Sequence, residues 1–191
     1  ASSLFAFGQR ESGEFGYSGM RSLEVEAETF AVEIRATPGR RVEMEVENAP
    51  SSYTVYHSTE NGGVRVWVER TFSLFSRPHR GRLVFLVPAD MALTVDTSTG
   101  EVYATGIATD SVSIETSTGS VLVEEFTRGA NVRSTTGGID IRRSEGDFTV
   151  RSTTGSIAIT SVDGDLEVSS STGSQRYEEI AGDIEARSTT G

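Results

Sequence analysis

Glycine closes a Ser/Thr-rich tetrapeptide every eighteen residues through the second half of the chain. This first series consists of Gly119, Gly137, Gly155, Gly173 and Gly191. A second series falls midway between its members, at Gly146, Gly164 and Gly182. The underlying unit therefore has nine residues. A fixed short period of this kind predicts a solenoid, whose coils contact mainly their neighbours and present ladders of similar side chains.

Each nine-residue unit predicts one short strand and one glycine corner. Positions 2 and 4 are apolar, as at Ile139 and Ile141, whereas positions 3 and 5 are mostly polar or charged. This alternation is typical of a strand with one buried face. Two units make one coil, so strands one coil apart should lie parallel and in register, about 4.8 Å apart. The glycine at position 9 should either adopt a backbone conformation closed to other residues or let the corner pack tightly.

Position 6 of every second unit carries a hydroxyl group. The column consists of Thr97, Thr116, Ser134, Ser152, Ser170 and Ser188. Continuing the alternation places these side chains inside the coil. We interpret the column as a buried hydroxyl ladder, in which each hydroxyl hydrogen-bonds to backbone groups at the corner and to neighbouring hydroxyls.

The first half of the chain alternates apolar and polar residues without the nine-residue period. Asn61-Gly62 lies between two such runs and predicts a hairpin turn. We divide the chain into an irregular segment 1–20, N-terminal strands 21–91 that form first rungs or a cap, and regular solenoid repeats 92–191 that are truncated or uncapped. The fold class we expect is all-β, a parallel β-helix with right-handed coils of eighteen residues in its C-terminal half.

Composition excludes several classes of partner and site. The formal net charge is −11 and the pI about 4.7, which argues against a nucleic-acid ligand because phosphate binding needs a concentrated basic face. The chain contains no cysteine, so disulfides and thiolate metal sites are ruled out. No apolar run approaches the ~20 residues of a membrane span. We expect no cofactor.

The Ser-Thr-Thr-Gly repeats, with the preceding strand that reaches Val87-Pro88, resemble the DUF4097 family of bacterial adhesin-like β-solenoids. The resemblance covers residues 21–191 and is strongest after residue 92. It implies a parallel β-helix, export to or association with the cell envelope, and no known catalytic residues. The function we expect is a non-enzymatic, envelope-associated structural or binding module with an unidentified protein or glycan ligand.

Two alternatives remain open at this point. The pattern stops at Gly191 without a capping sequence, and bare solenoid ends invite stacking, so the chain could be a scaffold that self-associates through its C-terminal coil. A carbohydrate-active enzyme would need paired carboxylates in a cleft, and no such pair stands out. His57 and His79 sit beside no obvious serine or acid pair. We assign no catalytic, cofactor-binding or metal-binding residue.

Two sets of acidic residues suggest further hypotheses. Stacked carboxylates in the column Asp147, Asp165 and Asp183 would repel one another, and either a calcium ion or nearby Arg151 and Arg187 could relieve that. Calcium-binding nonapeptides need the pattern Gly-Gly-x-Gly-x-Asp, whereas only one glycine per unit is regular here. Alternating glutamates could bind a cationic peptide, or simply prevent edge pairing and keep the chain soluble. They are Glu24, Glu26 and Glu28, and Glu43, Glu45 and Glu47.

Overall fold

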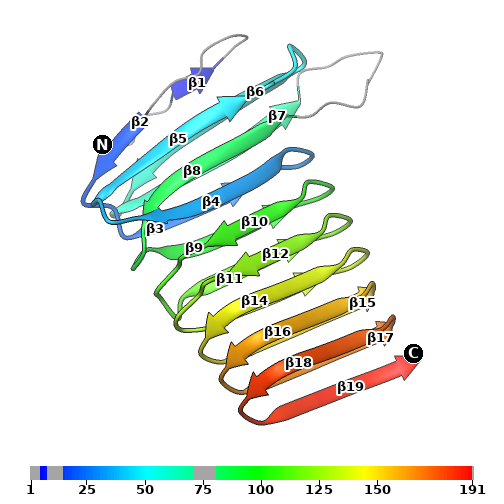
Figure 1. Ribbon diagram of the computed structural model, residues 1–191. Helices are drawn as coiled ribbons and strands as arrows, with labels where there is room; N and C mark the ends of the chain where they lie inside the picture. The colour runs from blue at the N-terminus through cyan, green and yellow to red at the C-terminus, as the bar shows by residue number, and fades with distance from the viewer. Residues whose placement is uncertain (1–4, 8–14, 71–80, 191) are drawn as a thin grey trace.

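The structure is a computed structural model that describes residues 5–7, 15–70 and 81–190. Within these ranges the chain forms nineteen strands and no helix, so they also hold no helix that could cross a membrane. The strands make two long sheets that face each other (Figure 1). The expectation of an all-β solenoid-like fold is therefore confirmed.

In the described residues one sheet has ten strands and the other nine. The ten-stranded sheet has the order β1 (Phe5–Phe7), β6 (Tyr53–Glu60), β7 (Gly63–Arg70), β3 (Ser22–Glu26), β9 (Ala92–Thr97), β11 (Val112–Thr116), β13 (Ala130–Ser134), β15 (Phe148–Thr154), β17 (Leu166–Thr172) and β19 (Ile184–Thr190). The nine-stranded sheet has the order β18 (Gln175–Ala181), β16 (Ile157–Asp163), β14 (Ile139–Glu145), β12 (Val121–Glu124), β10 (Val102–Thr105), β4 (Ala31–Thr37), β8 (Arg82–Pro88), β5 (Arg41–Glu47) and β2 (Phe15–Ser18).

From β9 onward the chain alternates between the two sheets, and each strand pairs in parallel with the strand one coil away. Ile139 lies opposite Ile157, and Ile157 lies opposite Gln175, which is the eighteen-residue register predicted from the glycines. The first complete coil is one residue longer, because Leu93 pairs with Val112. The coils stack in chain order along this half of the molecule (Figure 1).

The N-terminal strands do not follow chain order. The β3–β4 coil lies between the β9–β10 coil and the strands β7 and β8, and all four of these contacts are parallel (Figure 1). Beyond them, β5 and β6 pair antiparallel with β8 and β7, and β2 and β1 pair antiparallel with β5 and β6. This end of the solenoid is therefore a mixed sheet rather than a run of regular coils.

The hairpin predicted at Asn61-Gly62 is confirmed. Glu60 pairs with Gly63 across a two-residue loop between β6 and β7. Asn61 has φ 51° and Gly62 has φ 78°. Positive φ at both positions is typical of the tight turns whose twist matches that of the flanking strands.

The core is a single thin layer between the two sheets. The apolar residues at positions 2 and 4 of the repeats are buried from Leu93 to Val168, as predicted, and they join the buried residues of the N-terminal strands in one cluster. Phe30, Phe85 and Phe126 are among the largest fully buried side chains. Only the last coil departs from this pattern, because its Ile184 is 43% exposed.

Close stacking explains the first glycine series, in which Gly119, Gly137 and Gly155 have no positive φ and Gly173 has φ 143°. A Cβ atom on Gly137 would lie 2.1 Å from the carbonyl oxygen of Gly119, and one on Gly119 would lie 1.8 Å from that of Gly100. Side chains cannot fit between these corners. In the second series, close stacking and a positive φ act together, as at Gly146 with φ 93°.

The hydroxyl ladder is buried from Thr97 to Ser170, as predicted, but its hydrogen bonds differ along the solenoid. Thr97 and Thr116 each accept the N–H of the corner glycine three residues later, at 3.1 and 3.0 Å. The hydroxyls of Ser134, Ser152 and Ser170 have no partner, so the prediction is wrong for them. For Ser152, the strand β15 continues into the corner as far as Thr154, and Gly155 N–H donates to the carbonyl of Thr172 at 3.1 Å instead.

Candidate functional site

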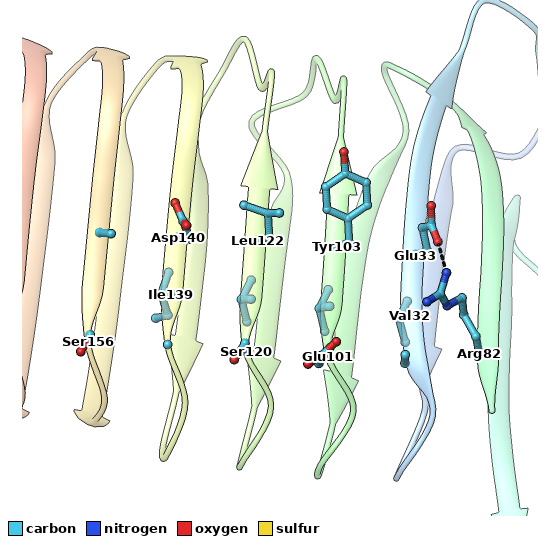
Figure 2. Close-up of a pocket in the computed structure, with 15 residues that line it drawn as sticks. Val32, Glu33, Arg82, Glu101, Tyr103, Ser120, Leu122, Ile139, Asp140 and Ser156 are labelled. Atoms are coloured by element: carbon cyan, nitrogen blue, oxygen red, sulfur yellow. Dashed lines mark hydrogen bonds and ion pairs between the residues drawn. The ribbon is translucent and has the colours of Figure 1, made fainter. Parts of the chain in front are cut away.

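A shallow groove of about 470 Å³ lies on the outer face of the nine-stranded sheet. It crosses β4, β10, β12, β14 and β16 (Figure 2). The parallel register creates it, because outward-facing residues of successive coils fall in one line. That line consists of Glu33, Tyr103, Leu122, Asp140 and Ala158.

Small residues make the groove concave. The strands β12, β14 and β16 are each preceded by a residue with a short side chain or none, namely Ser120, Gly138 and Ser156. Tyr103 and Leu122 rise beside this row, with Glu101 at its start (Figure 2). The result is a mostly apolar floor flanked by hydroxyl groups, which is the usual composition of a ligand site.

Two of the carboxylates that line the groove are held by ion pairs. The carboxylate of Glu33 is only 10% exposed and contacts Arg35 and Arg82, the latter at 3.0 Å (Figure 2). Further along, Asp140 is paired with Arg142 on the same strand. These pairs fix the side chains and satisfy their charges before any ligand arrives.

Tyr103 is held at the centre of the groove by its own hydrogen bond. The phenol donates to Oε2 of Glu124 at 3.0 Å, and Glu124 is also paired with Arg143 at 2.5 Å. Burial, and then the bond to Glu124, raise the pKa of Tyr103 above its ordinary value. The ring therefore presents a neutral aromatic surface with its hydroxyl anchored.

A backbone irregularity brings Arg142 and Arg143 to the outer face together. Arg143 has φ 46°, and the alternation restarts after it, so that Ser144 is buried. Residues one coil apart share this left-handed conformation, at Glu125, Arg143, Ser161 and Glu179. None of them is a glycine or an asparagine, so residue type does not predict this column.

The predicted acidic strands lie on different sheets. Glu24 and Glu26 are on β3 of the ten-stranded sheet, whereas Glu43 and Glu45 are on β5 of the nine-stranded sheet. The two sets therefore cannot form one cationic-peptide site. Glu28 follows β3 and has φ 34°.

Glu24 and Glu26 border a second cavity of about 610 Å³ on the ten-stranded sheet. Arg65 contacts Glu26 at 2.5 Å and Glu24 at 3.8 Å. Trp67 stacks on Tyr56 with ring centroids 5.4 Å apart. Nearby, burial and then repulsion from other carboxylates raise the pKa of Asp96.

The Asp147 column is tied into the backbone. Asp147 Oδ1 accepts the N–H of Asp165 at 3.0 Å, and Asp165 Oδ1 accepts the N–H of Asp183 at 2.9 Å. The arginines suggested as their partners are engaged elsewhere, since Arg151 pairs with Glu167 and Arg187 with Glu185. The described ranges contain no group of three or more His, Cys, Asp or Glu side chains placed to hold a metal ion. Calcium binding by this column is untested.

His57 is buried between the two sheets, where it contacts a tyrosine of the opposite sheet. His57 is on an inward position of β6, 1% exposed, and its Nδ1 contacts the hydroxyl of Tyr17 on β2. The contact joins the two sheets near the N-terminal end. Burial lowers the pKa of His57 and raises that of Tyr17. His79 lies outside the described residues.

Sequence reasoning did not find the groove. Its signal was present, however, because Tyr103 and Leu122 are apolar residues at outward positions where the repeat is mostly polar. Two apolar residues at outward positions one coil apart indicate an apolar patch on the surface of the sheet. Arg82 could not have been found in this way, since β8 reaches the groove only through the order of the N-terminal strands.

Several solved structures are similar to this chain. One is described as a "putative adhesin" from Bacteroides fragilis NCTC 9343, with 10% identity, a TM-score of 0.46, and coverage of 98% of this chain and 97% of the other. Another is described as a "putative cell adhesion protein" from Clostridium sporogenes ATCC 15579, with 5% identity, a TM-score of 0.39, and coverage of 98% and 99%.

A third, from Parabacteroides distasonis ATCC 8503, is described as a "putative lipid binding protein", with 9% identity, a TM-score of 0.34, and coverage of 99% and 95%. Among curated proteins, none matches this sequence. The family model described as Toastrack DUF4097 matches residues 89–178, which span the coils from β9 to β18. The resemblance inferred from the repeats is thereby confirmed for residues 89–178, which match the DUF4097 family model.

Proposed function

We propose that the protein is a non-enzymatic, adhesin-like binding module of the bacterial cell envelope, and that the groove on the nine-stranded sheet is its ligand-binding face. The observation that carries this proposal is the groove itself. It combines a volume of about 470 Å³, within the usual range of ligand sites, with an aromatic side chain anchored at its centre.

A binding role suits these residues better than a catalytic one. The repeated hydroxyls from Thr97 to Ser170 point into the core, where no substrate reaches them. In the groove, Glu33 and Asp140 are each paired with arginine side chains. This pairing occupies carboxylate oxygens that a general acid or base would need to reach the substrate.

The proposal is tested by binding of fluorescently labelled chain to purified bacterial cell-envelope fragments. We expect saturable binding that Tyr103→Ala weakens by about tenfold or more, as for a central aromatic anchor. Trp67→Ala is the matched control, because it removes an aromatic side chain from the opposite sheet. Equal binding by the unaltered chain, Tyr103→Ala and Trp67→Ala, or no saturable binding at all, would contradict the proposal.

A second candidate function, a self-assembling scaffold, is favoured by the last coil. The strands β18 and β19 end the two sheets of the described chain, and Ile184 is the large apolar side chain left exposed there. We propose that chains of these 191 residues stack through this coil. Light scattering should then give a mass that rises with concentration for the unaltered chain and stays monomeric for Ile184→Lys. A monomer at every concentration would contradict stacking.

Two finer points of architecture are also proposals. We propose right-handed coiling, the sense found in nearly all parallel crossovers, and a division into segments 1–20, 21–91 and 92–191. An experimental structure decides the first. Limited proteolysis decides the second, since cleavage near residues 20 and 91 before other sites is expected, and first cleavage within the repeats would contradict it.

A further inference from the structure

Two of the three carboxylates that line the groove, Glu33 and Asp140, are already paired with arginine, whereas Glu101 is exposed to solvent. Glu33 is paired with two arginines and Asp140 with one. A charged ligand would have to compete with these pairs. Each carboxylate has about four acceptor positions and each guanidinium five N–H donors, so the ion pairs leave groups free to bind neutral hydroxyls. The electrostatics of the groove therefore favour an uncharged polar ligand.

The position of the groove in the sheet disfavours a peptide. Peptides that bind sheets in extended form add to an open edge, where backbone groups are free. Here β4, β10, β12, β14 and β16 each have a hydrogen-bonded strand on both sides. The groove also crosses these strands instead of running along them (Figure 2). A bound chain would consequently meet side chains only.

The floor has the polarity of a sugar-binding surface. Tyr103 and Leu122 present adjacent apolar surfaces; the hydroxyl-bearing Ser120 lies beside them, and Ser156 lies two strands further along the groove (Figure 2). A pyranose ring has an apolar C–H face and a rim of hydroxyl groups, so it matches both parts. Five strands at about 4.8 Å spacing extend roughly 19 Å, which suits several linked rings better than one.

We propose that the groove binds a neutral oligosaccharide across β10, β12 and β14, with the C–H faces of its rings on Tyr103 and Leu122. The hydroxyl groups of the sugar bind Asp140 and the serine row, while the Glu33–Arg82 pair closes one end. This inference rests on the proposed function and adds the chemical class of the ligand.

The direct test is isothermal titration of the chain with cellohexaose, chitohexaose and mannohexaose, and with hexagalacturonate as the charged comparison. At least one neutral hexasaccharide should bind, with an affinity that does not change between low and high salt, because no charges are screened. Tyr103→Ala should weaken that binding by about tenfold or more. Tyr103→Phe keeps the ring and should bind as the unaltered chain does, as should Trp67→Ala.

Three outcomes would overturn the inference. They are no binding of any neutral hexasaccharide, tighter and salt-sensitive binding of hexagalacturonate, and binding that Tyr103→Ala does not weaken. Competition on envelope fragments separates this inference from the proposed function. Envelope binding that depends on Tyr103 but that no hexasaccharide competes for would reject only the sugar. Envelope binding that survives Tyr103→Ala would reject the groove as the ligand-binding face.

Discussion

The unequal hydrogen bonding of the hydroxyl ladder leads to a sharp prediction about Thr116 and Ser152. Both side chains are buried, at 2% and 6% exposure. Thr116→Val keeps the shape of the side chain but removes the acceptor of Gly119 N–H, a bond of 3.0 Å. Leaving a buried donor unsatisfied costs about 1–3 kcal/mol. We therefore expect a loss of about 2 kcal/mol in the free energy of unfolding, or roughly 4–8 °C in melting temperature for a chain of this size.

The matched substitution is Ser152→Ala, which removes a hydroxyl group of the same ladder two coils later. Its hydroxyl has no hydrogen-bond partner, and the corner amide of Gly155 donates to Thr172 instead. Removing a buried polar group that is not hydrogen-bonded relieves a desolvation cost. We expect a change between zero and a gain of about 1 kcal/mol. Removing the hydroxyl group should thus destabilise the folded chain at Thr116 but not at Ser152, although both residues belong to the same ladder.

Amide hydrogen exchange gives the residue-specific readout. A local loss of about 2 kcal/mol should speed exchange of Gly119 N–H roughly thirtyfold in Thr116→Val, since 1.4 kcal/mol is a factor of ten. Gly155 N–H should exchange at an unchanged rate in Ser152→Ala. Comparable destabilisation by the two substitutions, or faster exchange at Gly155, would refute the argument that corners are satisfied differently along the solenoid.

Other predictions follow from the corners, the buried histidine and the aspartate column. Gly137→Ala should cost about 3 kcal/mol or more, because its Cβ would meet a carbonyl oxygen at 2.1 Å, whereas Gly138→Ala meets nothing closer than 3.7 Å and should be nearly neutral in thermal melts. Burial lowers the pKa of His57, so the unfolded chain takes up a proton that the folded chain resists, and stability falls as pH drops below about 6.5. Denaturant melts of His57→Gln should lose this dependence, and an identical pH slope would contradict it. Millimolar Ca²⁺ should leave the melting temperature unchanged, because Asp147 and Asp165 already accept backbone N–H groups; a clear rise would indicate a cation site.

The repeats made the C-terminal half predictable because each residue there has one repeated environment. Ile139 and Ile141 face the core for the same reason as Ile157 and Ile159, so one rule covers every coil. The rule failed for the hydroxyls of the later serines, since alternation says which face a side chain occupies but not which partner it finds. It failed again at Arg143, which has a left-handed backbone conformation although it is neither a glycine nor an asparagine.

The sequence by itself determined the period, the inward face of each strand and the need for glycine where corners stack, because these follow from short-range geometry repeated along the chain. Only the tertiary structure decided which strands lie beside β4. Placing Arg82 next to Glu33 requires β8 to pair with a strand about fifty residues earlier in the chain, and no local pattern records such a choice. The groove likewise exists only because the register lines up Tyr103, Leu122 and Asp140 from separate coils.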